Sequence, residues 1–209
     1  MLSAGALTFK EFAMHEQVPL ATIHEAVLEF LRNRDDVVLF GAQAVNAYVG
    51  EPRMTQDIDL MSPRAAELAE ELREHLNQLF HLAIRVREIG EGRGYRLYQV
   101  QKLGNRHLVD LRPVENLPLS QRIEQVLVMQ PAELIASKVI SFHQRRGKPK
   151  SGTDWRDLAM LLLTFPELKS ETGVVSERLR IANADAVIIQ VWKDLVATEI
   201  EPPDEDDEF

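Results

Sequence analysis

The stretch GEPRMTQDIDLMS (residues 50–62) places two aspartates, Asp57 and Asp59, on either side of a single isoleucine. Within QDIDLM, this alternation predicts a β-strand with both carboxylates on one face and apolar side chains on the other. The spacing alone is a weak signal, because it recurs at Asp204 and Asp206 near the end of the chain. Two interpretations compete, a metal site or two solvated carboxylates on an ordinary strand, and the surrounding sequence has to decide between them.

The residues before this stretch predict two helices with a strand between them. Residues 21–36 repeat apolar side chains at helical spacing, which is typical of an amphipathic helix. VVLF (37–40) is a short apolar run ended by Gly41, and it indicates a buried strand. AQAVNAYV (42–49) then suits a short helix that stops at the glycine and proline that follow.

The residues after the stretch predict a longer helix and three more strands. Ser62 suits an N-cap and Pro63 the first position of a helix that continues with leucines at helical spacing. LAIRVREI and YRLYQVQ are expected to form strands joined by the glycine-rich loop at 90–94, and HLVDLRP (107–113) forms another. By strict alternation along HLVDLRP, His107 falls on the face opposite Asp110, so it receives no role.

After residue 130 the pattern becomes helical. PAELIASKVISFHQRR, DWRDLAMLLLTF and NADAVIIQVWKDLVATEI each predict a helix, and GKPKSGT links the first two. The sequence therefore predicts an α/β (α+β) chain with a mixed sheet flanked by helices over residues 1–125. An all-helical lobe is expected over 126–198, followed by an acidic tail over 199–209.

The composition is that of a soluble globular protein, with 45% hydrophobic and 27% charged residues in a chain of 209. The absence of cysteine excludes disulfides, thiolate catalysis and cysteine-bound zinc. The longest apolar run, LAMLLL (158–163), is too short to span a bilayer. The first residues lack a basic region followed by a long apolar run. We therefore expect a cytoplasmic protein without a membrane partner.

The formal net charge is −9, and residues 199–209 contribute seven acidic and no basic side chains, which leaves −2 for the rest. This composition predicts a disordered, self-repelling tail, and the alternative is a docking tail for a basic partner or a nucleic-acid mimic. RRGKPK (145–150) carries four positive charges. We interpret it as a solvated loop, and contact with the phosphates of a nucleic-acid acceptor is the alternative.

The stretch LFGAQAVNAYVGEPRMTQDIDLMS resembles the nucleotidyltransferase superfamily, which has the DNA-polymerase-β-like fold. More narrowly, it is similar to bacterial nucleotidyltransferase-like proteins related to the AbiE-type abortive-infection toxins. The later stretch PAELIASKVISFHQRR…TDWRDL resembles the Lys and Asp-x-x-Asp-Leu segments of that group. Together the similar stretches cover about a third of the chain, in the expected order. The matching positions in the first stretch are Gly41, Ala44, Val45, Pro52, Arg53, Thr55, Asp57 and Asp59.

The resemblance implies Mg²⁺-dependent transfer of a nucleoside monophosphate from an NTP such as ATP to an acceptor hydroxyl, with Mn²⁺ as the alternative metal. Asp57 and Asp59 would hold the metal, and Asp110 would be the third ligand and a candidate base, with Glu88 and Glu115 as alternative carboxylates. The chemistry agrees, because carboxylates hold Mg²⁺ while substrate phosphates complete its coordination. Two aspartates at positions i and i+2 of a strand lie about 6 to 7 Å apart on one face.

The residues predicted to contact the nucleotide surround this pair. A glycine turn at Gly41 lets backbone approach phosphates, and Ala42 stands where the superfamily usually has glycine or serine. Arg53 and Thr55 would touch a phosphate or orient the loop, and both also suit an ordinary turn. Lys138 would neutralise the triphosphate, although a lysine in mid-helix is equally explained as a surface side chain.

Other readings of the sequence stay open. Asp154 suits the acidic first turn of a helix. For Asp157 a structural pairing with Arg145 or Arg146 is favoured at least as much as a chemical role. The chain could also be a catalytically inactive nucleotide-binding or protein-interaction module that retains the fold, and Ala42 is the best support for that alternative. An acceptor of RNA such as tRNA, of protein or of a small molecule is left undecided. The resemblance also implies a toxin-antitoxin component with an antitoxin protein as partner.

Overall fold

The computed structural model describes residues 18–101 and 104–202. The acidic run at 203–209, including the second Asp-x-Asp pattern, lies outside the described residues. The strands are β1 (Val38–Phe40), β2 (Ile58–Ser62), β3 (Ile84–Ile89), β4 (Gly94–Gln99), β5 (Arg106–Pro113), β6 (Ser120–Ile123) and β7 (Val126–Met129). The helices are α2 (Leu20–Leu31), α3 (Gly41–Asn46), α4 (Ala65–Phe80), α5 (Pro131–Gln144), α6 (Lys150–Thr164), the 3₁₀ turn η1 (Pro166–Leu168), α7 (Val174–Ile181) and α8 (Ala186–Ala197).

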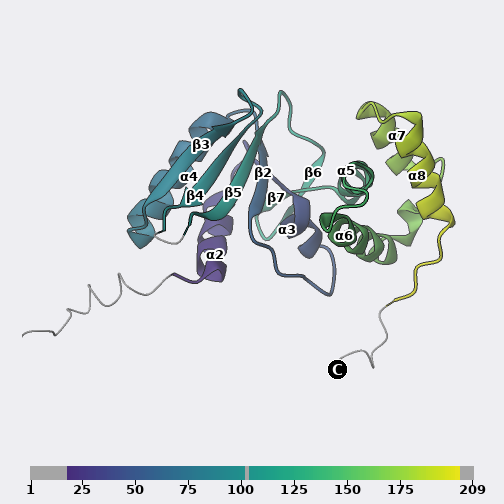
Figure 1. The fold of residues 1–209 in the computed structure, drawn as a ribbon, viewed down its shortest axis with the longest axis horizontal. Coiled ribbons are helices and arrows are strands. Elements are labelled where there is room, and N and C mark those ends of the chain that lie inside the picture. The colour runs from purple at the N-terminus through teal and green to yellow at the C-terminus, as the bar shows by residue number, and fades with distance from the viewer. Residues whose placement is uncertain (1–17, 102–103, 203–209) are drawn as a thin grey trace, which may run out of the picture.

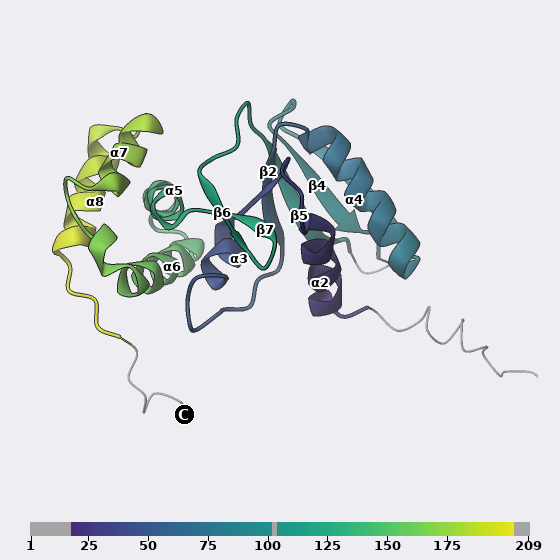
Figure 2. The ribbon, with the colours of Figure 1, turned by 180° about the vertical axis from the view of Figure 1, so that it is seen from behind.

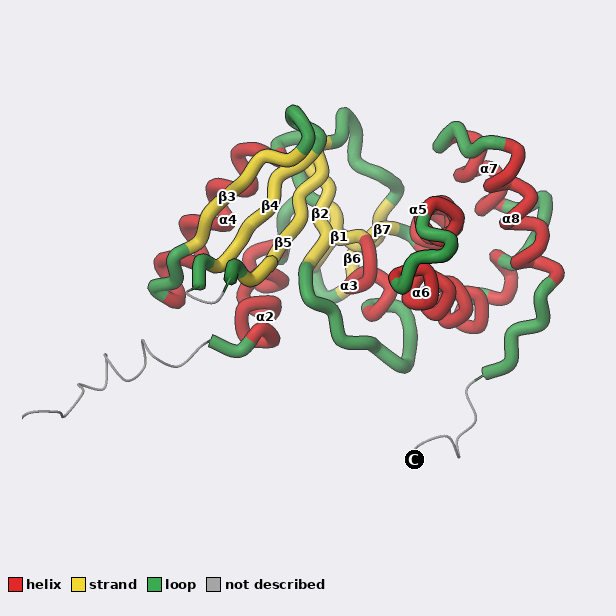
Figure 3. Tube along the Cα trace, viewed as in Figure 1, coloured by secondary structure: helices red, strands yellow, loops and turns green. Residues whose placement is uncertain are grey.

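The strands form one mixed sheet in the order β3-β4-β5-β2-β1-β7-β6 (Figure 3). The central strand β2 is antiparallel to β1 and parallel to β5, while β1 is parallel to β7. The other neighbours, β3 with β4, β4 with β5 and β6 with β7, pair antiparallel, and in each pair the strands follow one another along the chain. The centre of the sheet therefore joins segments that are far apart along the chain, and it brings their ends together.

Some helices cover one face of the sheet, and the C-terminal helices form a separate lobe beside it. Helices α2 and α4 lie against the same face, and Leu68, Leu72 and Leu76 of α4 are fully buried there at helical spacing (Figure 2). Helices α5 to α8 form an all-helical lobe beside the sheet, with α3 between the two (Figure 1). This architecture confirms the predicted fold class. No helix in the described ranges is long and apolar enough to cross a bilayer.

The helical lobe is built around α5, which packs against α6, α7 and α8. Pro131 occupies the first turn of α5, where its missing N–H costs no helical hydrogen bond. The indole Nε1 of Trp192 in α8 donates to Ser176 Oγ at 2.9 Å, so the fully buried ring has its polar atom satisfied.

The sheet contains more strands than the sequence predicts. The hairpin β6–β7 was not expected, and it carries the sheet to Met129, so the helices of the lobe begin only at Pro131. Helix α7 was also not expected. Helix α6 begins at Lys150, inside the segment predicted as a linker.

Ser62 does not cap a helix, contrary to the prediction. It is the last residue of β2, and α4 begins at Ala65 without a side-chain cap. Its Oγ donates to the carbonyl of Asp36 at 2.6 Å and accepts from the backbone N–H of Arg64 at 3.0 Å. The hydroxyl therefore ties the end of the strand to a neighbouring turn instead of starting the helix.

Candidate active site

Strand pairing brings the three predicted aspartates together. Asp59 lies opposite Phe40, the last residue of β1, and opposite Asp110 of β5 on its other side. Because neighbouring strands are about 4.8 Å apart, the carboxylates of Asp59 and Asp110 start from adjacent backbone positions. Asp57 immediately precedes β2, and both Asp57 and Asp110 act electrostatically on Asp59. Their catalytic and metal-binding roles stay a prediction.

Gly41 lies against this cluster at the end of β1. Its φ of +70° is in the left-handed region, which favours glycine. A Cβ added there would stand 2.1 Å from Asp59 Oδ2, well inside contact distance. The absence of a side chain therefore lets the backbone at the start of α3 approach the carboxylate of Asp59.

We expect Gly41→Ala to lower the free energy of unfolding by at least about 2 kcal/mol, because the left-handed backbone and the contact with Asp59 both oppose a side chain. Chemical denaturation measures the loss. Gly50→Ala is the matched control, since a Cβ there meets nothing within 4 Å, and its effect should stay within about 0.5 kcal/mol. Equal stability of Gly41→Ala and wild type would contradict the close approach.

His107 bridges two of the aspartates, so the prediction that it faces away from Asp110 is wrong. Its Nδ1 lies 3.1 Å from Asp57 Oδ2, and its Nε2 lies 3.0 Å from Asp110 Oδ1. The register between β4 and β5 shifts after Leu97, so that Leu108 becomes an extra residue in β5. Such a bulge interrupts the two-residue alternation of side chains and turns His107 toward Asp110.

The pKa values around His107 report these contacts. Burial acts to lower the pKa of His107, but hydrogen bonds with Asp110 and Asp57 outweigh it and raise the pKa to about 9. The hydrogen bond from His107 holds the pKa of Asp57 below its ordinary value. Burial would raise the pKa of Asp110, yet hydrogen bonds from His107 and Arg96 lower it to about 2. At neutral pH the bridge is therefore an imidazolium between two carboxylates.

Because folding raises the pKa of His107 above 6.5, its stabilising effect is complete below pH 6.5 and is lost as the pH rises through about 9. We expect His107→Gln to cost about 2 kcal/mol at pH 6, reduced from the full shift by partial exposure, and almost nothing at pH 10. Denaturant unfolding of the wild type and of His107→Gln between pH 6 and pH 10 measures this difference in stability. His75→Gln, on α4 and packed against Phe30, is the control for replacing a histidine away from the carboxylates.

Asp59 behaves in the opposite way to its neighbours. Burial raises its pKa, and repulsion from Asp57 and Asp110 raises it further, to about 6. No side chain in residues 18–101 and 104–202 forms an ion pair with Asp59. The folded protein therefore places more negative charge around Asp59 than its neighbouring cations neutralise.

These residues fit a divalent cation. Asp57, His107 and Asp110 offer ligand atoms that all lie within 4.8 Å of one another. Carboxylate oxygens suit Mg²⁺ and Mn²⁺, whereas imidazole is preferred by other metals, so the aspartates are the relevant donors. The uncompensated charge at Asp59 is what a bound cation would offset.

Three arginines line a small cavity beside the carboxylates. The space of about 160 Å³ borders Asp59 and Asp110 and is lined by Arg93, Arg96 and Arg112. Arg96 donates to both oxygens of Asp110, with Nε at 2.5 Å and Nη2 at 2.9 Å. This bidentate contact fixes the plane of the Asp110 carboxylate. Sequence reasoning gave Arg96 no role, although its position one strand away from Asp110 is an ordinary cross-strand pair.

Lys138 and Arg53 meet at one buried carboxylate. Lys138 Nζ lies 2.6 Å from Asp157 Oδ2, and Arg53 donates to both oxygens of the same group at 2.7 and 2.9 Å. The side chain of Asp157 is fully buried, and its pKa is lowered because these hydrogen bonds and charges outweigh burial. The loop before β2 is thereby fastened to helix α6 of the lobe.

Asp157 does not pair with Arg145 or Arg146, which corrects the sequence interpretation. Arg145 instead contacts Asp154, with Nη1 at 3.0 Å from Oδ2, and Lys138 Nζ lies 3.6 Å from the other oxygen of Asp154. One turn of α6 separates the two aspartates, so Asp154 faces the end of α5 and Asp157 faces the loop.

The other predicted nucleotide contacts are spread around the site. Ala42 follows Gly41, the residue that lies against Asp59, in the first turn of α3. Thr55 lies in the loop before β2 and lines a separate cavity beside α2. The structure therefore groups Gly41 and Ala42 with the carboxylates, joins Arg53 to Lys138, and leaves Thr55 apart.

Residues 25–204 match the family model described as "Nucleotidyl transferase AbiEii toxin, Type IV TA system". The chain belongs to the AbiEii family. This match confirms the resemblance to nucleotidyltransferases and covers both the sheet and the helical lobe. As an AbiEii member the protein is a nucleotidyltransferase, and the family is described by toxins of Type IV toxin-antitoxin systems. A comparison with curated proteins gives no match.

Solved structures share the AbiEii protein's fold at low sequence identity. The Megavirus polyadenylate synthase is 14% identical with a TM-score of 0.57, and the match covers 70% of this chain and 32% of that one. JHP933 from Helicobacter pylori is 14% identical with a TM-score of 0.52, over 92% and 91% of the two chains. ANT(2")-Ia in complex with adenylyl-2"-tobramycin is 16% identical with a TM-score of 0.50, over 79% and 97%. The chain spans about a third of the polyadenylate synthase, and these likenesses show the fold alone.

Proposed function

We propose that this AbiEii protein transfers a nucleoside monophosphate from an NTP to an acceptor hydroxyl and releases pyrophosphate, with Mg²⁺ or Mn²⁺ as cofactor. The observation that carries the proposal is the convergence of Asp57, Asp59 and Asp110 beside the backbone of Gly41. A phosphate transfer needs charge stabilisation on the entering and leaving oxygens, and this cluster is built to hold positive charge.

The chain's own residues would divide the work as follows. Asp57, Asp59 and Asp110 would hold the cation, which when bound would offset charge on the phosphate oxygens. Backbone N–H groups at Gly41 and Ala42 would approach the phosphates, because no side chain at Gly41 stands in the way. A pKa of about 2 suits Asp110 to ligand binding better than to proton transfer, since an effective base has a pKa near the working pH.

Arg53 and Lys138 would supply positive charge to the triphosphate while Asp157 positions both. Lys138 has three N–H donors, and Asp157 and Asp154 lie within reach of the ammonium group. Arg53 uses its Nε and Nη2 edge on Asp157. The other donors of both groups would contact a phosphate, although Arg53 Nη1 also donates to the carbonyl of Met54 at 3.4 Å. Thr55 would orient the same loop.

Acceptor, nucleotide and partner are further parts of the proposal. RNA such as tRNA, protein and small molecules all offer hydroxyl groups, and the carboxylate cluster itself favours none of them. ATP is the first NTP to test. The family description also supports an antitoxin that counteracts the activity. A cytoplasmic location fits an enzyme that uses intracellular NTPs.

A catalytically inactive, nucleotide-binding module is the second candidate, and Ala42 favours it. Alanine at this position offers a backbone N–H but no hydroxyl for a phosphate oxygen. The two candidates differ in one measurable product, because only the enzyme releases pyrophosphate.

The test incubates the full chain with Mg²⁺, each α-labelled NTP and RNA, protein or small-molecule acceptors. We expect labelled acceptor and pyrophosphate, lost in Asp57→Asn and retained in Asp35→Asn, whose carboxylate is exposed away from the cluster. Mn²⁺ binding measured by electron paramagnetic resonance should weaken in Asp57→Asn as well. NTP binding without pyrophosphate would favour the inactive module. No transfer, with NTP and Mn²⁺ affinities unchanged in Asp57→Asn, would refute both roles of the site.

A further inference from the structure

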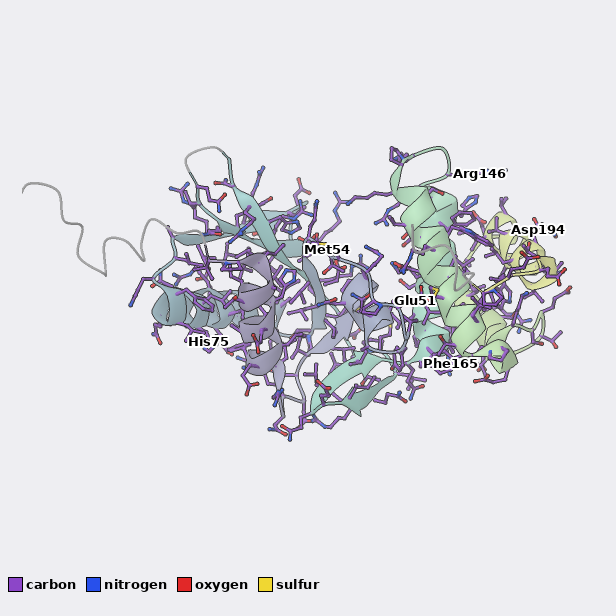
Figure 4. All side chains as sticks on the ribbon, turned by 90° about the horizontal axis from the view of Figure 1, so that it is seen from below. Glu51, Met54, His75, Arg146, Phe165 and Asp194 are labelled. Carbon is purple, nitrogen blue, oxygen red and sulfur yellow. The ribbon has the colours of Figure 1, made fainter. Side chains whose placement is uncertain are left out.

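A cavity of about 500 Å³ lies between α2, α3 and the loop before β2, outside the carboxylate cluster. Its wall includes His24 from α2, Gln43 from α3 and Thr55 from the loop, and Glu124 from the turn between β6 and β7 closes one side. Met54 of the same loop lies between α2 and α3 in the view from below, and its side chain is 96% exposed (Figure 4). None of the three aspartates lines this space.

His24 provides an unused polar atom at this cavity. The residue is only 7% exposed, and its Nε2 has no hydrogen-bond partner among the described residues. Buried polar side chains in folded proteins are nearly always hydrogen-bonded, so an unpartnered buried nitrogen in a residue that lines the cavity points to a bound group.

The ring of His24 is set up to accept a hydrogen bond. Burial lowers its pKa, while a backbone hydrogen bond to Gln56 and the charge of Asp57 act in the opposite direction without reversing the shift. The ring is therefore neutral at neutral pH. In a neutral imidazole one nitrogen carries the proton and the other accepts, and Nε2 is the nitrogen without a partner.

The uncompensated charge at the cavity wall is negative. Arg32 pairs with Glu29, with Nε at 2.9 Å from Oε2, and Arg53 is committed to Asp157 at 2.7 Å. Glu25 and Glu124 line the same space and form no ion pair within the described ranges. A ligand bearing a positive charge would therefore be favoured over an anion.

Part of the wall is apolar. Leu20, Ala21 and Leu28 of α2 line the cavity, and an adjoining space of about 340 Å³ is lined by Leu39, Val126 and Val128 among others. Hydrogen-bonding side chains, among them Gln43, Asn46 and Thr55, line much of the remainder, so a small molecule would meet apolar and polar groups together.

We propose that this cavity binds a small organic cation, an amine or amidinium on a compact apolar body. One N–H would donate to His24 Nε2, the positive charge would face Glu25 and Glu124, and the apolar body would pack on α2. Arg53 and Thr55 line the cavity, and Asp57 follows two residues later, so an occupant would contact the loop that carries part of the carboxylate site. The cavity therefore shares Arg53 and Thr55 with the proposed nucleotide contacts, whereas none of the three aspartates of the carboxylate cluster lines it.

Benzamidine is a suitable probe, with neutral benzamide and anionic benzoate as ligands of the same shape. Titration of the ¹⁵N-labelled full chain should shift the backbone amide signals of Gln43 and Thr55 with benzamidine, and only weakly with the other two. The Glu25→Gln, Glu124→Gln double variant alters exposed side chains only. It should lower the affinity for benzamidine at least about tenfold. His24→Phe should do the same, and Asp59→Asn should leave the affinity unchanged.

Several results would overturn the site. They are absence of benzamidine binding to the wild-type chain, equal affinity for benzamide, or unchanged affinity in the double variant. Loss of benzamidine binding in Asp59→Asn would place the amidinium on the carboxylate cluster instead. Because His24→Phe alters a buried residue, its thermal unfolding is measured alongside, and the double variant gives the deciding comparison if that protein is unfolded.

Discussion

Asp59→Asn is expected to remove nucleotidyl transfer while making the folded protein more stable. Asp59 carries charge that the protein does not compensate, because burial and repulsion from Asp57 and Asp110 raise its pKa to about 6. Removing that charge relieves the repulsion and at the same time removes a proposed metal ligand. We expect transfer to fall by at least about 10²-fold, the range for losing one electrostatic group from an active site.

The sign of the stability change follows from proton binding. The pKa of Asp59 rises from 3.8 to about 6 on folding, so the folded state holds this proton more tightly than the unfolded state. The free energy of unfolding therefore falls as the pH rises from about 4 to about 6, and the loss persists above pH 6. The full shift corresponds to about 3 kcal/mol, and partial exposure reduces the expected gain in Asp59→Asn to about 1–2 kcal/mol at pH 7.

Denaturant unfolding at pH 4 and pH 7 measures the gain, which should be present at pH 7 and small at pH 4. Asp57→Asn is the matched control, because His107 holds the pKa of Asp57 below its ordinary value. That variant should also lose transfer but should be less stable than wild type at pH 7. If Asp59→Asn is destabilised like Asp57→Asn, the carboxylate of Asp59 stabilises the fold and the charge argument is wrong.

The pKa values of Asp57 and Asp59 shift in opposite directions, which the sequence alone does not predict, whereas it does predict where the two residues lie. The alternation in QDIDLM and the glycine at position 41 are local patterns, and both were sufficient to place the carboxylates beside a glycine turn. The helical period of PAELIASKVISFHQRR likewise predicted helix α5. Features of this kind depend on only a few neighbouring residues.

The missed features depend on pairing between distant segments. The register shift after Leu97 inserts Leu108 into β5 and turns His107 to the site, and no local pattern in HLVDLRP reports it. Strand β7 is recognisable only through its parallel pairing with β1, on the other side of the carboxylate strands. Short strands of this kind gain their stability from the sheet and not from their own residues.

The contact between Arg53 and Asp157 belongs to the same class, since 104 positions separate the two residues. The sequence placed Asp157 correctly in a structural pairing but gave it the wrong arginine, because Arg145 lies nearer along the chain. Sequence distance is a poor guide here, since a loop of any length can return to α6 at little additional entropic cost.

Asp157→Ala is expected to be the most destabilising single substitution at this site. The side chain of Asp157 is fully buried, and its removal leaves the ammonium of Lys138, itself 9% exposed, without its main partner. It also releases the bidentate contact of Arg53. Breaking a buried ion pair from one side costs about 3–5 kcal/mol, because the remaining charge is left in a poorly solvated place.

Urea denaturation measures this loss, and Asp185→Ala on α8 is the control. Asp185 caps its helix by accepting from Ile188 N–H at 2.9 Å, so its loss should cost about 1 kcal/mol. Transfer should also decrease in Asp157→Ala, because Arg53 is no longer held to the lobe. An Asp157→Ala protein within 1 kcal/mol of wild type would show that Lys138 and Arg53 reach water easily, contrary to their burial.

The double variant Lys138→Met, Asp157→Leu separates the charge effect from packing. If the loss in Asp157→Ala comes from an unpaired lysine, replacing both partners by apolar side chains of similar size should restore most of the stability. If the loss comes from the missing contact with Arg53 and its loop, the double variant should stay as unstable as Asp157→Ala. Because Arg53 is 22% exposed and Lys138 only 9%, we expect the first result. Transfer should remain low in the double variant, since Lys138, the proposed triphosphate contact, is then absent.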